Sequence, residues 1–427
     1  MVIVICNGKV ITPSSKKGEN TDILIEDGIV KSIGKNLKIP KDAEIIDASG
    51  LLVSPGFVDL HCHLRDPGDP EEETIASGTN SAAKGGFTSI SCMANTNPPI
   101  DSPSMVKYVV SEAKSSGVVN VFPIGAVTVG LEGKKLAQMG RMLGEGAVAF
   151  SDDGRPIADS KIMRLALEYA KAFDVKIISH PENLELSVGG QMNEGAMSTI
   201  LGLRGIPRQA EEIMVERDIS LAAEFGSVHI THVSTASSVK LIREAKSKGI
   251  PVTADTCPHY FSLTEKEVDG FNTFAKVNPP LRGENDRREI VLGLKDGTID
   301  AIATDHAPHR EEKKNVEFGL AAKGMVGFET AFPLALTFLS EEIPLNEIIG
   351  KMTINPAKIL GIPKGEIKVG VDADIVIVDP NAEYEVDIKS FASKSKNSPF
   401  NGMKVKGRIV YTIVGGKIVV RDKKLLF

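Results

Sequence analysis

No stretch of the sequence approaches the ~20 consecutive apolar residues that a membrane-spanning helix needs, so we expect no membrane partner. A nucleic-acid surface would require a basic patch, but the positive charges are scattered and the net charge is −6. The four cysteines lie far apart and form no CxxC pair, which favours reduced thiols in a cytoplasmic protein. The apolar amino terminus is short and lacks the basic segment of a signal peptide. These absences predict a cytoplasmic protein that binds neither nucleic acid nor membranes.

Both ends of the chain have the pattern of β-structure. Residues 2–53 contain short runs rich in valine and isoleucine, separated by Asn-Gly, Asp-Gly and Ser-Gly turns. The same pattern returns between residues 365 and 422, with a Gly-Gly turn near its end. Because two β-rich ends flank a different middle, we expect one small β-sandwich module built from residues 1–54 and 365–427.

The middle of the chain, residues 55–364, alternates apolar strand-like runs with amphipathic segments. The predicted strands lie within residues 57–63, 88–93, 119–125, 146–154, 175–180, 228–234, 250–260 and 300–309. Strands that are apolar on both faces and followed by helices indicate a buried parallel sheet. Eight such units predict an α/β fold of the (β/α)8 TIM-barrel type, in which the active site lies at the carboxyl ends of the strands. A doubly wound open sheet is the alternative, but no GxGxxG motif follows the first strand.

Histidines stand at the ends of three predicted strands. His61 and His63 close the first strand, where residues two apart point to the same face. Chance alone gives about 0.15 such pairs, so the pair is suggestive, and two surface or hydrogen-bonded histidines are the alternative. His180 and His232 each end another apolar run, whereas His229 should point to the opposite face and be structural. A lone strand-end histidine is more often structural, but four that converge on one barrel mouth favour a metal site.

Two aspartates extend this candidate metal site. Asp305 ends the eighth strand, and a buried carboxylate is costly without a partner such as a metal ion. Asp153 ends the fourth strand beside Asp152. We expect Asp152 to serve in a turn or helix cap and Asp153 to face the barrel mouth, where it can bridge two metal ions.

Four more polar residues are candidates for binding a substrate. Arg65 follows the histidine pair, and its guanidinium group suits a carboxylate; a surface ion pair with a neighbouring aspartate is the alternative. Asn95 and Asn278 lie in proline-containing loops after the second and seventh strands, where each could instead be a turn residue. His309, in the loop after the eighth strand, either donates to a substrate carboxylate or caps that loop.

The stretches PGFVDLHCHLRDPG, MANTNPP, SDDG, VNPPLR and ATDHAPH, in this order and spacing, resemble those of the bacterial-type dihydroorotases of the amidohydrolase superfamily. The resemblance runs from end to end and includes the GVDADIVIVDP stretch of the carboxyl-terminal β-region. It implies the reversible cyclisation of N-carbamoyl-L-aspartate to L-dihydroorotate, a step of de novo pyrimidine synthesis. It also implies that one or two zinc ions are held by His61, His63, Asp153, His180, His232 and Asp305. A homo-oligomer is expected.

The resemblance further assigns the remaining candidates. Arg65, Asn95 and His309 would clasp the substrate carboxylate, and Asn278 would lie near the ring. Asp305 would act as general base and general acid.

Two alternatives stay open. Hydantoinases and dihydropyrimidinases resemble the chain in their metal ligands, but they bridge the metals with a carboxylated lysine, and residues 146–154 offer only Asp152 and Asp153. Some dihydroorotase-like proteins are inactive partners of aspartate carbamoyltransferase and lack the metal-binding histidines, all of which are present here. The charged segment 310–327 is either a lid over the barrel mouth or an exposed loop.

Overall fold

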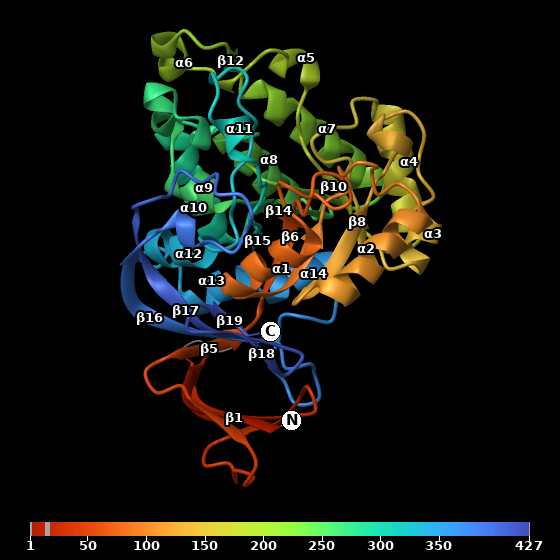
Figure 1. Ribbon diagram of the computed structural model, residues 1–427. Coiled ribbons are helices and arrows are strands. Elements are labelled where there is room, and N and C mark those ends of the chain that lie inside the picture. Colours follow the sequence, from red (N-terminus) through yellow and green to blue (C-terminus); the bar gives the residue numbers. More distant parts are fainter. Residues whose placement is uncertain (1, 13–17, 427) are drawn as a thin grey trace.

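Eight parallel strands form a nearly closed barrel in the computed structural model, which describes residues 2–12 and 18–426. Each strand pairs with the next strand of the barrel along the chain (Figure 1). The barrel strands are β6 (Phe57–Cys62), β7 (Phe87–Cys92), β8 (Asn120–Gly125), β9 (Ala149–Phe150), β10 (Ile177–Ser179), β13 (Val228–Ile230), β14 (Val252–Thr256) and β15 (Ala301–Ile302). Cys62 at the end of β6 bridges to His306 just after β15, which joins the two edges. This order confirms the predicted barrel and excludes a doubly wound sheet.

Most of the helices surround the barrel, whereas α5 and α6 lie beyond the ends of its strands, at the top of the view in Figure 1. The helices are α1 (Ile75–Lys84), α2 (Pro103–Ser116), α3 (Met139–Gly144), α4 (Ser160–Lys171), α5 (Leu184–Ser187), α6 (Ala196–Leu201), α7 (Gln209–Phe225), α8 (Ala236–Ser247), α9 (Pro258–Ser262), α10 (Glu284–Asp296), α11 (Glu311–Lys314), α12 (Ala331–Leu339), α13 (Leu345–Lys351) and α14 (Ile354–Leu360). The sequence of α4 shows why they form. The Asp159 side chain caps its first turn, and the buried positions 163, 166, 167 and 170 repeat with the helical period.

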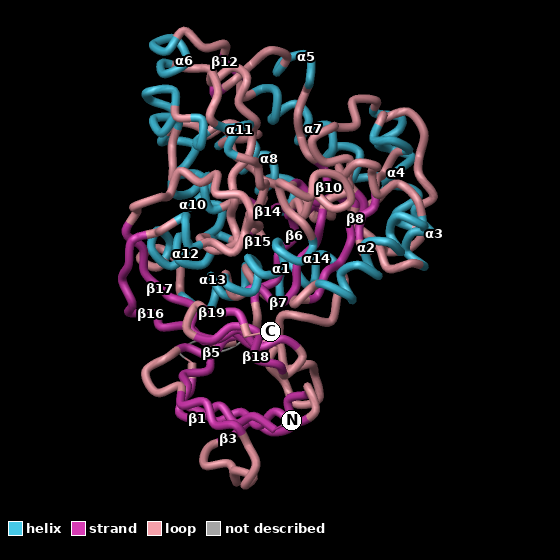
Figure 2. The backbone as a smooth tube through the Cα atoms, in the orientation of Figure 1, coloured by secondary structure: helices cyan, strands magenta, loops and turns pink. Residues whose placement is uncertain are grey.

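The two ends of the chain form one mixed nine-stranded sheet. Its strands are β1 (Val2–Val10), β2 (Glu19–Glu26), β3 (Ile29–Gly34), β4 (Glu44–Asp47), β5 (Leu52–Pro55), β16 (Ile375–Glu385), β17 (Lys404–Val414), β18 (Lys417–Arg421) and β19 (Lys424–Leu425). Figure 2 shows this sheet folded into two layers below the barrel. The layers enclose a core of their own that includes Ile3, Ile25, Val53, Ile375 and Ile413. The predicted composite β-module is therefore a single folded sheet, and the domain boundaries at residues 54 and 365 remain a prediction.

The folded sheet and the barrel join at Gly56, the one residue between β5 and β6. A Cβ atom at this position would lie 2.2 Å from the Thr88 side chain on β7, so only glycine fits. β5 pairs with β1 along one edge and with β16 along the other, and the second pairing joins residues 52–55 to residues 375–378.

Smaller features complete the fold. A two-stranded sheet of β11 (Met192–Asn193) and β12 (Gly205–Ile206) lies in the long connection between β10 and β13. Within the described residues, no helix combines the length and apolarity that crossing a membrane would require. Cys6, Cys62, Cys92 and Cys257 are free thiols, and all but Cys6 are buried.

Candidate metal centre and active site

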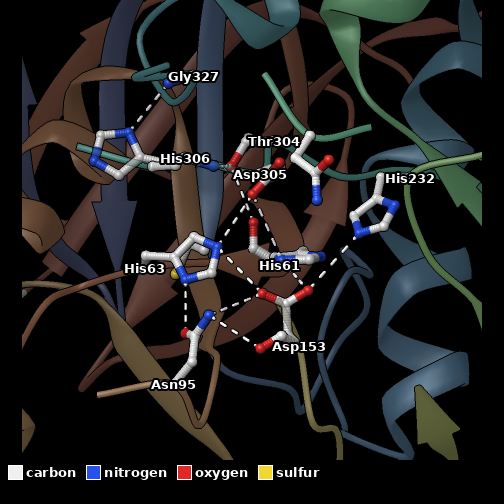
Figure 3. Close-up of polar contacts among 12 residues, drawn as sticks. His61, His63, Asn95, Asp153, His232, Thr304, Asp305, His306 and Gly327 are labelled. Carbon is white, nitrogen blue, oxygen red and sulfur yellow. Dashed lines mark hydrogen bonds and ion pairs between the residues drawn. The ribbon is translucent and has the colours of Figure 1, made fainter. Parts of the chain in front are cut away.

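Five barrel strands end in a cluster of histidines and aspartates (Figure 3). The cluster consists of His61 and His63 from β6, Asp153 after β9, His180 after β10, His232 after β13 and Asp305 after β15. Each side chain is buried, because the strands that deliver it are apolar and enclosed by helices. The structure thus brings together all six residues expected to hold metal.

Asp153 is the central carboxylate of the cluster. Its Oδ1 lies 3.4 Å from Nε2 of His61, 3.2 Å from Nδ1 of His180 and 3.7 Å from Nε2 of His232. Its Oδ2 lies 3.6 Å from Nε2 of His63. The two oxygens of Asp153 therefore face different imidazoles, three at Oδ1 and that of His63 at Oδ2.

Asp305 closes the other side of the cluster. Its Oδ1 lies 3.1 Å from Nε2 of His63 and 3.5 Å from Nε2 of His61. Among the described residues, this buried His61 nitrogen has no hydrogen-bond partner. In the part of the chain that the structure describes, the possible ligands form three overlapping groups: His61, Asp153 and His232; His61, His63 and Asp305; and Cys257, His259 and Asp305. The first two consist of expected ligands, whereas Cys257 and His259 were not among those expected. An unpartnered nitrogen between two carboxylates fits a metal ion, because an unmet buried polar atom is otherwise costly.

The outer hydrogen bonds of the histidines direct the lone pairs of the inner nitrogens. The Thr231 hydroxyl donates to Asp255, so its oxygen accepts from Nδ1 of His61 at 2.9 Å and leaves Nε2 as the inner nitrogen. Nδ1 of His63 donates in the same way to Oδ1 of Asn95 at 3.0 Å. In His180 the roles are reversed, because Nε2 faces Glu182 at 3.2 Å and Nδ1 faces the cluster. Such partners fix the tautomer of a metal-binding histidine.

The charges of the cluster call for a compensating cation. Burial favours the neutral form of Asp153, but His61 and the hydrogen bond from His180 hold its pKa well below the usual range. Burial lowers the pKa of His61, yet Asp153 and Asp305 outweigh that effect and raise it to about 9. The pKa of His180 rises to about 10, because its bonds to Asp153 and Glu182 outweigh burial. The raised pKa values of His61 and His180 show that the buried carboxylates favour positive charge at the cluster, and a divalent metal ion would supply such charge.

Three residues of the site have left-handed backbone conformations that non-glycine residues rarely adopt. They are Arg65 with φ 55°, His232 with φ 42° and Asp305 with φ 46°. Strain of this kind persists where the surrounding structure holds a side chain in a functional position.

A cavity of about 220 Å³ opens above the cluster. Nine of the ten predicted site residues line this cavity, and the tenth, His61, is buried. A second cavity of about 740 Å³ shares His63, Arg65, Asn95 and Asp153 with the first and leads outward. Together they provide a chamber for a small polar ligand above a metal-binding floor.

Comparison with known proteins identifies the family. The amidohydrolase family model matches residues 52–419. A dihydroorotase from Acetivibrio thermocellus is 54% identical over 428 residues, which cover 99% of this chain and 100% of that protein. A dihydroorotase from Ruminiclostridium cellulolyticum is 55% identical over 429 residues, which cover both chains completely. The chain belongs to the dihydroorotase family of amidohydrolases.

Solved structures of related amidohydrolases share the fold. The L-hydantoinase (dihydropyrimidinase) of Arthrobacter aurescens superposes with a TM-score of 0.90 at 27% identity, covering 100% of this chain and 97% of that one. The dihydropyrimidinase of Brevibacillus agri superposes with a TM-score of 0.87 at 26% identity, covering 100% of this chain and 96% of that one. The fold of the chain is therefore shared with hydantoinases and dihydropyrimidinases. Its sequence identity to the dihydroorotases is about twice as high as its identity to those enzymes.

At the mouth of this dihydroorotase-family site, Arg65 and His309 lie together. A terminal nitrogen of Arg65 is 3.4 Å from Nε2 of His309. Glu72 joins them, 3.4 Å from Nε of Arg65 and 3.1 Å from Nδ1 of His309. Burial would raise the pKa of Glu72, but His309 and Lys313 lower it to about 2. Arg65 therefore pairs with Glu72 through Nε, and its side chain lines the cavity.

The two asparagines contact the candidate metal ligands. Nδ2 of Asn95 donates to Oδ2 of Asp153 at 3.1 Å, in addition to the bond that Asn95 accepts from His63. Nδ2 of Asn278 donates to Glu182 at 3.0 Å, and its Oδ1 accepts from Lys323 at 3.3 Å. Both also line the cavity, so each can contact a bound ligand.

Several residues of the site were missed in the sequence. Glu182 follows His180 by two residues and Glu72 lies in a charged loop, and neither position differs from a surface loop in pattern. Asp255 is buried on β14, where a lone carboxylate among apolar residues indicates a structural or functional role.

Lys323 belongs to segment 310–327, which packs against the barrel through Phe318 and Met325 and so is not a simple exposed loop. Asp152, as expected, is structural and accepts from the backbone of Val127 and Thr128.

Proposed function

We propose that the chain catalyses the zinc-dependent, reversible cyclisation of N-carbamoyl-L-aspartate to L-dihydroorotate, with Asp305 as the acid–base residue. The single observation that carries the proposal is the joint presence of the histidine–aspartate cluster and the Arg65–His309 pair around one small cavity. A metal-assisted amide reaction needs the histidine–aspartate cluster, and binding of a substrate carboxylate needs the Arg65–His309 pair.

Zinc is the proposed metal, with one or two ions per chain. Four imidazoles and two carboxylates suit zinc, and the bridging position of Asp153 supports two ions. Within the described residues, the only lysine that lines the cavity is Lys323, which belongs to the loop after the eighth strand and not to β9. This supports a carboxylate bridge in place of the carboxylated lysine of the hydantoinase type. Zinc, when bound, makes water nucleophilic near neutral pH and polarises a carbonyl group.

Asp305 is placed to move the proton. In ring opening it accepts the proton of the attacking water and delivers it to the departing ring nitrogen; ring closure retraces these steps. The pKa of Asp305 lies well below its usual range because His61 and His63 outweigh burial, so the side chain begins as a base. Arg65, Asn95 and His309 meanwhile hold the retained carboxylate, and Asn278 lies near the ring.

A cyclic amidase of the hydantoinase or dihydropyrimidinase type is the second candidate, favoured by the superpositions with those enzymes. The test is to load the protein with zinc and follow ring opening of dihydroorotate, hydantoin and dihydrouracil side by side. Turnover of dihydroorotate alone supports the proposal. Turnover of the uncharged rings moves the chain to the second candidate.

The proposed partners follow from the same activity. The chain would bind carbamoyl aspartate and dihydroorotate, act in the cytoplasm and form a homo-oligomer. Association with aspartate carbamoyltransferase is tested by mixing the two purified proteins and measuring the mass of the species formed. If the zinc-loaded chain is inactive alone and gains activity in such a complex, the partner-dependent interpretation replaces an independent enzyme.

A further inference from the structure

Lys323 is a cation on the wall of the cavity of about 220 Å³, and it forms no ion pair with any residue that the structure describes. Its Nζ donates to Oδ1 of Asn278 at 3.3 Å, and among the described residues no carboxylate oxygen lies within 4.0 Å of it. Arg65, which also lines this cavity, pairs with Glu72 through Nε, and its terminal nitrogens are assigned to the carboxylate that the substrate retains. An ammonium group that faces a cavity and is not neutralised within the protein is available to an anionic ligand.

The backbone around Lys323 is fixed by a second, buried lysine. Nζ of Lys314 donates to the carbonyl oxygens of Ala322 at 2.8 Å and Gly324 at 2.9 Å, the two residues that flank Lys323. The carbonyl oxygen of Lys323 itself accepts from Nε2 of His309 at 2.8 Å. Gly324 has φ 132°, and a Cβ atom there would lie 2.7 Å from that of Ala307. The segment is thus built to hold Lys323 close to His309.

Lys323 lies between the two halves of the site. Through its backbone it contacts His309, which belongs to the Arg65–His309 pair. Through its ammonium group it contacts Asn278, which in turn contacts Glu182 beside His180 of the metal cluster. Asn278 and Glu182 therefore link the ammonium group to the metal cluster, where the reacting end of the proposed substrate would lie.

The proposed substrates differ in charge at this end. Carbamoyl aspartate carries two carboxylates. In ring closure the urea nitrogen forms a bond to the carbon of one of them, a C–O bond breaks, water leaves and one proton is taken up. Dihydroorotate keeps only the other carboxylate. A cation near the reacting end thus meets a negative charge in the open-chain substrate that is absent from the ring.

We propose that Lys323 binds the carboxylate that ring closure consumes, and so determines the affinity for the open-chain substrate. The inference rests on the proposed function and adds a specificity-determining residue to it. An ionic hydrogen bond of this kind changes binding by about 10- to 100-fold.

The test compares Lys323→Met with Lys323→Arg and with Lys240→Met, whose side chain is exposed on α8. KM and kcat are measured in both directions on the zinc-loaded protein. Because the solution equilibrium fixes the ratio of the two kcat/KM values, any change in kcat/KM must be the same factor in each direction. For Lys323→Met we expect kcat/KM to fall in both directions. In ring closure the fall should appear as a KM for carbamoyl aspartate that is raised by about 10- to 100-fold, and in ring opening as a lowered kcat. The KM for dihydroorotate should change far less.

Lys323→Arg should regain most of the affinity, and Lys240→Met should match the wild type. An equal rise of KM for both substrates, or no rise for either, overturns the inference. A wild-type protein that fails to open dihydroorotate overturns the proposed function instead, so the two failures are distinguishable. Zinc content and the unfolding midpoint, measured on every variant, identify a loss caused by misfolding.

Discussion

Nδ1 of His180 lies 2.7 Å from Nε2 of His232, and both nitrogens face the same oxygen of Asp153. This spacing is that of an N–H···N hydrogen bond, in which one imidazole donates its proton to the other. A metal ion would take the place of that proton, so both nitrogens are candidate ligands. Replacing His180 by Ala should therefore lower the zinc content per chain, with the barrel still folded. Elemental analysis by mass spectrometry after dialysis gives the readout, and an unchanged zinc content would show that His180 holds no metal.

Asp305 provides the next prediction. Asp305→Asn keeps the shape of the side chain but removes the base, so kcat for dihydroorotate opening should fall by about 10²- to 10⁴-fold. Asp296→Asn, on the exposed end of α10, serves as the control. The rates are read from the loss of ring absorbance at saturating substrate. Full activity in Asp305→Asn would remove this residue as the acid–base group.

Arg65 distinguishes substrate binding from metal binding. Arg65→Ala should raise the KM for dihydroorotate by about 10- to 100-fold, since a charged hydrogen bond to the carboxylate is lost. Zinc content should stay at the wild-type level, because the contacts of Arg65 are with Glu72, Pro308 and His309 and not with the metal cluster. If zinc is lost instead, Arg65 supports the metal ligands and its substrate role is wrong.

Asp255 tests the outer support of the cluster. Its carboxylate accepts from the Thr231 hydroxyl at 3.0 Å, from the His232 backbone at 2.7 Å and from Nε2 of His229 at 2.8 Å. Asp255→Asn should weaken zinc binding by about 10- to 100-fold, because Thr231 then holds His61 less firmly. Competition with a zinc-binding dye measures the change. Wild-type affinity would show that Asp255 stabilises only the fold.

Glu72 gives a pH prediction. Its folded pKa of about 2 lies below the ordinary value of 4.5, so the carboxylate stabilises the fold above pH 4.5 and loses that contribution as the pH falls toward 2. Glu72→Gln should be less stable than the wild type by a constant amount above pH 4.5, and the gap should close below it. Urea midpoints between pH 3 and 7 provide the comparison. A gap that does not depend on pH would exclude this ionic contribution.

The sequence predicts the barrel and the position of its ligands for one physical reason. A strand buried on both faces must be apolar, so a histidine or aspartate that ends such a run marks the barrel mouth. His61, His180 and Asp305 were found in this way, and the structure places them together. His229, expected to be structural, hydrogen-bonds to Asp255 and Thr253 outside the cluster.

What the sequence did not reveal depends on contacts between distant loops. Lys323 and Asn278 are 45 residues apart, and their hydrogen bond exists only because segment 310–327 folds back onto the barrel. The choice of Nδ1 in His180 likewise depends on Glu182 and not on any strand pattern. In the terminal module, β1 pairs with β4 over residues 3–6 and with β5 over residues 9–10, and short valine-rich runs do not encode this choice of partners.

The pairing of β5 with β16 has a consequence for synthesis on the ribosome. Residues 52–55 emerge early, but their partners at 375–378 emerge only after the whole barrel sequence has been made. During that time one edge of β5 is without its partner, and unpaired edges are prone to join other chains. The folded sheet is therefore completed last, and a chain that stops before β16 leaves this edge open even when all the residues of the metal cluster are present.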